Sequence, residues 1–126
     1  MYEIGVVAQF EAAHRLVGDF GPATRLHGHT YRLEVVARGE RLRDDWTLYD
    51  VGRLRELVDG LAAELNYRNL DEVSDLTDLN TTAEAVAHFC WERLAQSLTG
   101  AGLSSLLVRV WESPQVYAAR DDALTS

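Results

Sequence analysis

Strict alternation of apolar side chains along two stretches constrains the fold of this chain most strongly. In residues 2–10 every even-numbered position is apolar, and within residues 29–38 the odd-numbered positions from 31 to 37 are apolar. A period of two predicts strands with one buried face. Less regular patterns predict two further strands and one short extended segment, at residues 103–112, 115–119 and 46–48.

The spacing of apolar residues in the middle of the chain changes to three and four, which predicts two amphipathic helices. The first covers residues 51–65 with Asp50 as its N-cap, and the second follows a capping box of Thr81 and Glu84 and ends near Gly100. The order strand, strand, helix, helix, strand, strand predicts an α+β fold in which two helices pack on one face of an antiparallel four-stranded sheet.

The length of 126 residues predicts one domain. We place this domain at residues 1–120 and expect residues 121–126 to form a polar C-terminal tail. A small sheet leaves open edges, and association of subunits is one way to cover them. We therefore expect a homo-oligomer.

The charged residues exclude several classes of function. Twelve basic residues against twenty acidic ones give a net charge of -8, and all twelve are arginine. A basic surface for nucleic acid or an anionic membrane is not expected, and neither is chemistry that needs a lysine amine. The single cysteine excludes an internal disulfide. Because the first residues do not resemble a signal peptide and no apolar run is long enough to span a membrane, we expect a cytoplasmic protein. The acidic net charge fits a small-molecule substrate better than a nucleic acid.

Three of the four histidines lie near the ends of the first two predicted strands. His27 and His29 are two residues apart, so on an extended chain both side chains point to the same face. His14 continues the parity of Phe10 along the first strand. If the two strands form a hairpin, three imidazoles meet at its open end, which is the ligand set of a catalytic zinc site with a fourth position for water or substrate. The alternative is that these histidines are polar surface residues.

Glu112 ends the apolar face of a predicted strand that also carries Val108 and Val110. A carboxylate buried at the end of such a face has to be hydrogen-bonded. It either accepts hydrogen bonds from the N–H groups of a ligand or marks the point where the strand reaches solvent. The pattern leaves both interpretations open.

Five segments, in order along the chain, resemble the 6-pyruvoyl-tetrahydropterin synthase and 6-carboxy-tetrahydropterin synthase family. They are Phe10-Glu11-Ala12-Ala13-His14-Arg15-Leu16, Arg25-Leu26-His27-Gly28-His29-Thr30-Tyr31, Tyr49-Asp50-Val51 with Leu54, Asn80-Thr81-Thr82-Ala83-Glu84, and Val108-Arg109-Val110-Trp111-Glu112. Together these segments extend over most of the chain.

This resemblance implies the tunnelling fold (T-fold), in which the sheets of several subunits join into a barrel. Family members usually form a hexamer, as a dimer of trimers, with active sites between subunits. The resemblance further implies that His14, His27 and His29 bind zinc, that Glu112 anchors the pterin ring and that Thr82 lies beside this ring. The zinc would hold the oxygens of the substrate's side chain as a Lewis acid.

The substrate of this family carries a triphosphate, which requires positive charge. Arg15 and Arg25 flank the three histidines in the sequence, and guanidinium groups pair bidentately with phosphate. We expect Arg25 in particular to contribute to substrate binding. The alternative is that these arginines only balance an acidic chain.

The residues that move protons in this family are absent. Ala23 stands where pterin synthases have a cysteine four residues before His-Gly-His, and Asn66-Tyr67 replaces an Asp-His pair. The neighbouring Pro22 and Thr24 offer no carboxylate in place of the cysteine. Because general acid-base catalysis typically supplies about 10²- to 10⁴-fold, loss of the whole relay indicates a changed reaction.

Four residues are candidates for a replacement acid or base, and the sequence does not rank Tyr67, Glu11, Asp19 and Asp71. Cys90 is not a candidate, because it lies on the apolar stripe of the second helix, where an inert core thiol is expected.

Three functions stay open. The first is a zinc-dependent lyase of this family with an altered proton relay, acting on a pterin or a related polyhydroxylated carbonyl compound. The second is the ordinary 6-carboxy- or 6-pyruvoyl-tetrahydropterin synthase reaction with a different base, and the third is a non-catalytic module that binds zinc and pterin. Retention of all three histidines favours an enzyme, because a pure binding protein has little use for an open metal position.

Overall fold

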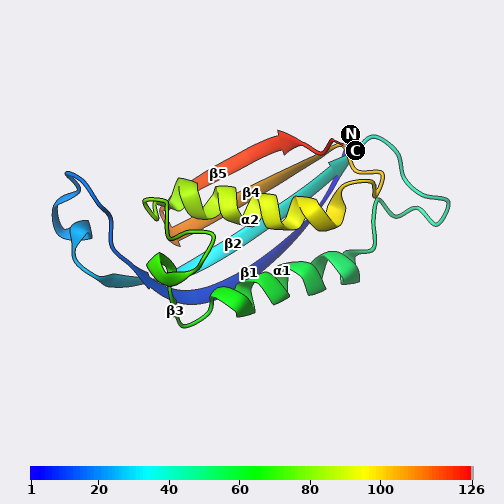
Figure 1. Ribbon diagram of the computed structural model, residues 1–126. Coiled ribbons are helices and arrows are strands. Elements are labelled where there is room, and N and C mark those ends of the chain that lie inside the picture. The colour runs from blue at the N-terminus through cyan, green and yellow to red at the C-terminus, as the bar shows by residue number, and fades with distance from the viewer. Residues whose placement is uncertain (126) are drawn as a thin grey trace.

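A computed structural model describes residues 1–125 of the chain as a sheet with both helices packed on one of its faces (Figure 1). The strands are β1 (Tyr2–His14), β2 (His27–Gly39), β3 (Arg68–Asn69), β4 (Ser105–Ser113) and β5 (Val116–Ala123). The helices are α1 (Val51–Leu65) and α2 (Ala83–Leu98), and short 3-10 turns cover Gly21–Thr24 and Leu70–Glu72. The α+β class is confirmed. Neither helix of the described chain has the length and apolar character needed to cross a membrane.

The sheet has the strand order β3-β1-β2-β4-β5. β1 and β2 pair antiparallel over their full lengths, from Tyr2 opposite Gly39 to His14 opposite His27. β4 is antiparallel to both of its neighbours. The prediction of four antiparallel strands was wrong in one respect, because β3 adds a fifth strand that is parallel to β1. β3 has only two residues, so it is too short to produce an alternating pattern.

The core lies between the helices and the sheet face that the alternation predicts. The fully buried rings of Phe10 and Tyr31 stack in this layer, with their centroids 4.9 Å apart. Leu54 and Val58 of α1 are fully buried against it. Cys90 of α2 is also fully buried, and burial raises the pKa of its thiol to about 12. The expected core position of this thiol is therefore confirmed.

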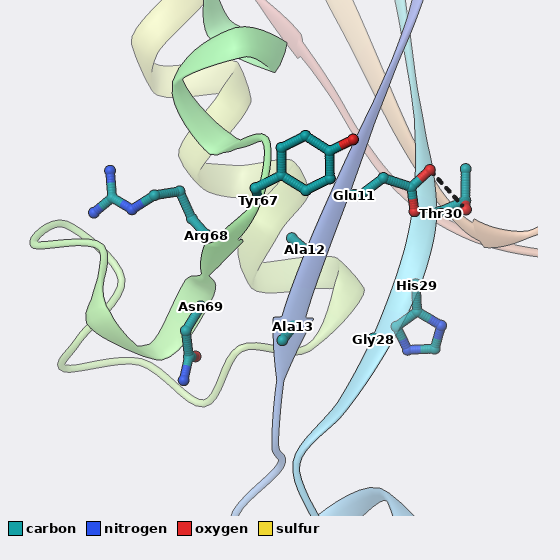
Figure 2. A pocket seen from close by; sticks show the side chains of 9 residues that line it. All are labelled: Glu11, Ala12, Ala13, Gly28, His29, Thr30, Tyr67, Arg68 and Asn69. Carbon is teal, nitrogen blue, oxygen red and sulfur yellow. Dashed lines mark hydrogen bonds between the residues drawn. The ribbon is translucent and has the colours of Figure 1, made fainter.

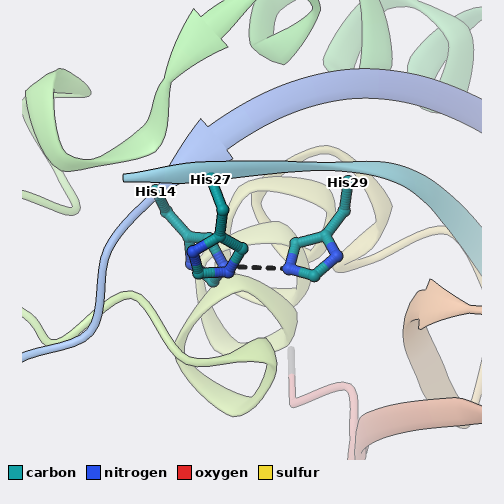
Figure 3. A group of neighbouring side chains, drawn as sticks. All are labelled: His14, His27 and His29. Carbon is teal, nitrogen blue, oxygen red and sulfur yellow. Dashed lines mark hydrogen bonds between the residues drawn. The ribbon is translucent and has the colours of Figure 1, made fainter. Parts of the chain in front are cut away.

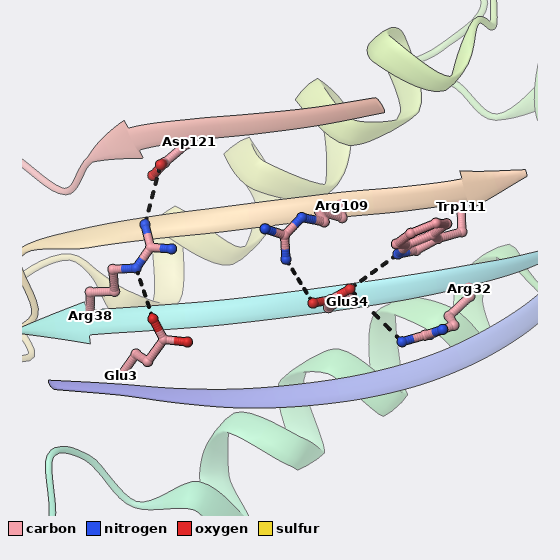
Figure 4. A network of polar contacts seen from close by, with 7 residues as sticks. All are labelled: Glu3, Arg32, Glu34, Arg38, Arg109, Trp111 and Asp121. Carbon is pink, nitrogen blue, oxygen red and sulfur yellow. Dashed lines mark hydrogen bonds and ion pairs between the residues drawn. The ribbon is translucent and has the colours of Figure 1, made fainter. Parts of the chain in front are cut away.

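The sheet face opposite the helices is largely polar (Figure 4). Arg109 of β4 donates to a carboxylate oxygen of Glu34 on β2 over 2.8 Å. Arg38 of β2 donates to Glu3 on β1 over 3.3 Å and to Asp121 on β5 over 3.2 Å. These side chains connect the four long strands on the face that the helices leave uncovered.

The helix N-termini are capped by side chains, one as predicted and one not. Asp50 caps α1 by accepting a hydrogen bond from the Arg53 N–H over 3.2 Å. The cap of α2 is Thr82, which accepts from the Ala85 N–H over 3.1 Å. The predicted capping box with Thr81 at the N-cap was wrong by one residue, because the hydroxyl of Thr81 bonds to another part of the chain.

Two other boundaries differ from the predictions. Residues 46–48 are an irregular bend and not an extended strand, and Trp46 there has a positive φ of 68°. β5 continues to Ala123, so the predicted polar tail at residues 121–126 is wrong in its first three residues, which pair with β4. Because Asp121 and Asp122 are charged, the spacing of apolar residues does not predict that the strand continues through them. Position 126 lies outside the described residues.

Candidate metal centre

The paired ends of β1 and β2 carry the three histidines singled out in the sequence. His14 lies opposite His27 in the register, and His29 lies two residues further along β2. The three rings extend from the same side of the strands toward one another (Figure 3). His14 is only 2% exposed, whereas His27 and His29 are half-buried. The hairpin therefore gathers these side chains, and this histidine cluster is the only such group of metal-ligating residues within residues 1–125.

The spacing of the ring nitrogens fits a zinc ion. One nitrogen from each ring lies within 4.8 Å of those of the other two, and His14 Nε2 and His29 Nε2 are 3.2 Å apart. Zn–N bonds of about 2.0–2.1 Å at tetrahedral angles place two nitrogens about 3.4 Å apart. Small side-chain rotations would therefore let three imidazoles bind one ion and leave a fourth position open.

Backbone carbonyls orient two of the three rings. His14 Nδ1 lies 2.7 Å from the carbonyl oxygen of Thr81, and His27 Nδ1 lies 2.7 Å from that of Arg25. A carbonyl oxygen only accepts, so Nδ1 is the donor in both contacts and Nε2 keeps its lone pair when the ring is neutral. Hydrogen bonds of this kind fix the tautomer of metal-binding histidines in proteins.

The electrostatic surroundings of His29 favour its neutral ring. Burial lowers the pKa of His29, the charge of Glu112 opposes this effect, and the neighbouring His14 and His27 lower the pKa further. The net result is a lowered pKa. A metal ion binds the neutral imidazole, so these surroundings keep His29 in the form that can act as a ligand.

Glu112 and Tyr31 present polar atoms beside the histidine cluster. Glu112 follows Trp111, which pairs with Arg32 in the sheet, so Glu112 lies next to Tyr31. Its carboxylate is half-buried and receives no hydrogen bond from residues 1–125. The hydroxyl of Tyr31 is buried and also has no partner in this part of the chain. Burial raises the pKa of Tyr31 most, and the charge of Glu112 raises it further. A polar ligand would complete such a site, since buried polar atoms are usually hydrogen-bonded.

The other predicted substrate-binding residues lie around the histidine cluster. Thr82 directly follows Thr81, whose carbonyl holds His14, and its hydroxyl oxygen caps α2. Arg25 contacts His27 through its backbone carbonyl, while its guanidinium is exposed, as is that of Arg15. Both guanidinium groups are without an ion-pair partner in the described chain, so both can reach an anionic ligand in solvent.

Asn66 and Tyr67 attach the end of α1 to β1. The Glu11 N–H donates to Asn66 Oδ1 over 2.9 Å, and the Tyr67 N–H donates to the Glu11 carbonyl oxygen over 2.6 Å. The Tyr67 side chain is 83% exposed. It borders a pocket of about 460 Å³ that Glu11, Arg68 and His29 also line (Figure 2). The Glu11 carboxylate accepts from Thr30 Oγ1 over 2.7 Å on the sheet face opposite to the His29 ring, which leaves Tyr67 as the candidate proton carrier in this pocket.

The remaining two candidates differ in their surroundings. Asp19 is exposed in the connection between β1 and β2. Asp71 is half-buried, and both of its carboxylate oxygens accept hydrogen bonds, one from Thr81 Oγ1 over 2.7 Å and one from the Arg15 N–H over 3.0 Å. The apolar pattern gave no signal for these contacts, because Asp71 and Thr81 lie in the irregular connection between the helices.

The fold matches that of solved pterin synthases. A 6-pyruvoyl tetrahydropterin synthase structure from Caenorhabditis elegans superposes with a TM-score of 0.81 at 26% sequence identity, over 96% of this chain and 95% of that one. The sequence profile of 6-pyruvoyl tetrahydropterin synthase matches residues 3–122. This chain therefore belongs to the 6-pyruvoyl tetrahydropterin synthase family, as the sequence motifs predicted.

Two relatives within this family carry different names. A dihydroneopterin monophosphate aldolase from Pyrococcus furiosus is 38% identical to this chain over 93 residues, which cover 74% of this chain and 75% of that protein. A 6-carboxy-5,6,7,8-tetrahydropterin synthase from Haemophilus influenzae is 29% identical over 139 residues, which cover 93% of this chain and 96% of that protein. The family thus combines lyase-type pterin chemistry with more than one reaction.

Proposed function

We propose that this chain is a zinc-dependent lyase that cleaves the side chain of a pterin with an altered proton relay. The observation that carries this proposal is the histidine cluster, in which His14 and His29 present their Nε2 atoms to each other at 3.2 Å. The half-buried carboxylate of Glu112 and the orphaned hydroxyl of Tyr31 lie beside it. An open metal position next to unsatisfied polar groups supports an enzyme over a binding module.

The reaction that fits the missing relay best is cleavage of the C1′–C2′ bond of a dihydroneopterin phosphate. The 2′-hydroxyl loses its proton and becomes an aldehyde, while the electron pair of the broken bond passes to C1′ and into the pterin ring. C1′ then takes up a proton. The products are 6-hydroxymethyl-dihydropterin and glycolaldehyde phosphate, so this route needs one proton acceptor and one donor.

Two observations support this cleavage over the ordinary synthase reaction. Ala23 and Asn66-Tyr67 leave the chain without the cysteine and the Asp-His pair of the synthases. The Pyrococcus furiosus relative at 38% identity is named an aldolase for dihydroneopterin monophosphate. The ordinary synthase reaction stays the second candidate, because the Haemophilus influenzae synthase matches 93% of this chain.

The residues of the chain take defined roles in this proposal. A zinc ion held by the histidine cluster would supply Lewis-acid polarisation of the side-chain oxygens. Glu112 accepts hydrogen bonds from the N–H groups of the pterin ring, and Thr82 lies beside this ring. Tyr67, which lines the pocket next to His29, is the candidate for the altered relay, because the Glu11 carboxylate lies on the sheet face opposite to the histidine rings and accepts from Thr30 Oγ1.

The phosphate of the substrate would bind to exposed arginine. Arg25 precedes the histidine pair by two residues, and its guanidinium has no ion-pair partner within residues 1–125. A guanidinium group offers two parallel N–H donors to a phosphate. Arg15 is the second candidate, on the other side of the hairpin opening.

The site is proposed to lie between subunits of a homo-oligomer, a hexamer built as a dimer of trimers. The sheet supports this arrangement because β5 has one open edge, and β1 pairs with β3 only at Ala12 and Ala13. Val116 on β5 is 53% exposed and Val7 on β1 is 50% exposed. Joining these edges into a barrel would satisfy their backbone groups. A cytoplasmic location stays a prediction.

The proposed reaction is tested by incubating the zinc-loaded protein with 7,8-dihydroneopterin, its monophosphate and its triphosphate. Products are identified by mass spectrometry with and without a chelator. We expect 6-hydroxymethyl-dihydropterin from a phosphate ester, loss of product with the chelator and loss of product in His29→Ala. His88→Ala is the matched control, because His88 is exposed on α2 and outside the histidine cluster.

Other products decide between the alternatives. A carboxy- or pyruvoyl-pterin that needs the metal would establish the ordinary synthase reaction and refute the cleavage. Absence of turnover together with tight pterin binding, lost in Glu112→Ala, would establish a non-catalytic pterin module.

A further inference from the structure

A chain of hydrogen bonds links His14 to a carboxylate in a distant part of the sequence. His14 Nδ1 lies 2.7 Å from the carbonyl oxygen of Thr81, and the hydroxyl of the same threonine donates to Asp71 Oδ1 over 2.7 Å. The other oxygen, Asp71 Oδ2, accepts from the N–H of Arg15, the residue that follows His14, over 3.0 Å. Asp71 therefore contacts both of the segments that meet at His14.

The hydrogen bond between His14 and Thr81 is shielded from solvent. Thr81 is 0% exposed and His14 is 2% exposed, so water does not compete for their contact. Because the carbonyl of Thr81 accepts only, His14 has to donate from Nδ1, and its Nε2 lone pair faces His29 Nε2 at 3.2 Å. The position of one backbone carbonyl thus determines which nitrogen His14 presents to the cluster.

The surrounding loops are arranged to hold Asp71 in place. The Asp71 N–H donates to Asn69 Oδ1 over 3.0 Å. Asn80, next to Thr81, accepts from the Val17 N–H over 2.9 Å and donates to the Val17 carbonyl oxygen over 3.0 Å. These bonds fix the connection between the helices against the end of β1. Among residues 1–125, only the Asp71 carboxylate joins the Thr81 side chain to Arg15.

We infer that Asp71 is a positioning residue: through Thr81 and Arg15 it sets the tautomer and direction of His14 and thereby strengthens metal binding. The part of this inference that concerns metal rests on the proposed zinc site, whereas the tautomer of His14 can be measured without metal. Asp71 is not the free base that the sequence left possible, because both of its oxygens are occupied by protein donors.

The role depends on two hydrogen-bonding positions and not on charge alone. In Asp71→Asn the amide oxygen can accept from the Arg15 N–H while the amide NH₂ donates to the Thr81 hydroxyl, which then acts as acceptor. Asp71→Ala removes both contacts. Thr81→Ser keeps the hydroxyl, whereas Thr81→Val removes it and keeps the backbone carbonyl.

The test measures the zinc affinity of the full chain by competition with a chromophoric chelator. Asp71→Ala and Thr81→Val are expected to weaken zinc binding roughly tenfold, the range in which outer contacts of metal ligands act. The double variant is expected to lose no more than the larger single effect, because both changes break one chain of contacts. Asp71→Asn and Thr81→Ser should stay near the wild type. The matched controls are Asp78→Ala and Thr77→Val, at exposed positions of the same connection.

The second measurement reads the tautomer of His14 in the metal-free protein by long-range ¹H–¹⁵N NMR. The wild type is expected to show a proton on Nδ1, and Asp71→Ala and Thr81→Val should show a mixture of both tautomers. If both variants keep the wild-type tautomer and zinc affinity, the inference is overturned. If the wild type binds no zinc, the proposed function fails while the tautomer still decides the role of Asp71. Should Asp71→Ala fail to fold, the Thr81→Val and Thr81→Ser pair decides the same question.

Discussion

Glu112 is a half-buried carboxylate that other residues of the described chain leave without a hydrogen bond. Burial lowers the pKa of His29 and raises that of Tyr31, and the charge of Glu112 opposes the first effect and adds to the second. In the proposed site a pterin supplies the missing donors. Replacing the carboxylate by an amide should weaken pterin binding roughly 10- to 100-fold, the effect of one or two hydrogen bonds to a charged group. Pterin fluorescence titration of Glu112→Gln checks this.

Zinc content should be unchanged in Glu112→Gln, because Glu112 is not part of the histidine cluster. Glu40→Gln serves as the control, since Glu40 is exposed at the far end of β2. Equal pterin affinity for Glu112→Gln and the wild type would refute the anchoring role.

Cys90 should be unreactive in the folded protein. Burial raises the pKa of its thiol to about 12, and a raised pKa lowers the fraction of reactive thiolate at every pH below it. Very little thiolate therefore forms near neutral pH, and the fully buried position blocks access as well. We expect a thiol reagent such as DTNB to label the chain only at the rate of unfolding, and at once in denaturant. Fast labelling of the native protein would contradict the core position.

Single residues differ in how well the sequence predicted them. The parity of His14, His27 and His29 along extended chains was enough to predict that they gather, because strand geometry is regular. The contact of His14 with Thr81 joins residues 67 positions apart through an irregular loop, so no periodic signal reports it. The unpaired hydroxyl of Tyr31 could not be predicted for another reason. The Tyr31 ring follows the apolar pattern of β2, and only the three-dimensional packing shows that its buried oxygen has no hydrogen-bond partner.

At the level of elements, Thr82 connects the stability of α2 to the site. It caps this helix through the Ala85 N–H and directly follows Thr81, whose carbonyl orients His14. Thr82→Ala should lower the free energy of unfolding by about 1 kcal/mol, as loss of an N-cap typically does. Urea denaturation measures this, and Thr82→Ser should stay near the wild type. An equal loss in the free energy of unfolding for Thr82→Ala and Thr82→Ser would show that the Thr82 hydroxyl does not stabilise the helix.

Elements with a long apolar stripe or alternation were predicted well, and short or charged ones were not. α1 and the first two strands follow from spacing alone, because each buries one regular face. β3 has two residues and depends on a tertiary contact with β1, and the end of β5 carries Asp121 and Asp122. The cap of α2 moved by one residue because Thr81 bonds to Asp71, a competition that only the three-dimensional arrangement reveals.

The whole molecule leaves one sheet face and two sheet edges uncovered. The polar side chains of the uncovered face, among them Glu34, Arg38 and Arg109, form ion pairs across the strands (Figure 4). Such a charged face fits the water-filled interior of the proposed barrel better than a contact between apolar surfaces. The layered fold could be predicted from the spacing of apolar residues, whereas the number of subunits in the proposed assembly rests on the family resemblance, since it depends on pairing between the edges of different subunits.

The proposed hexamer has a definite mass in solution. Six chains of 14.1 kDa give about 85 kDa, and a single trimer gives about half of this. Light scattering coupled to size-exclusion chromatography should show the larger species at micromolar protein. A monomer under these conditions would contradict the barrel and the placement of sites between subunits.

Metal content measures directly whether the histidine cluster holds a zinc ion. The wild type, His14→Ala, His29→Ala and His88→Ala are loaded with zinc, desalted and analysed by inductively coupled plasma mass spectrometry. We expect one zinc per chain in the wild type and in His88→Ala, and almost none in His14→Ala and His29→Ala, because two imidazoles hold zinc far more weakly than three. Zinc content in His14→Ala and His29→Ala equal to that of the wild type would show that the histidine cluster is not the zinc site.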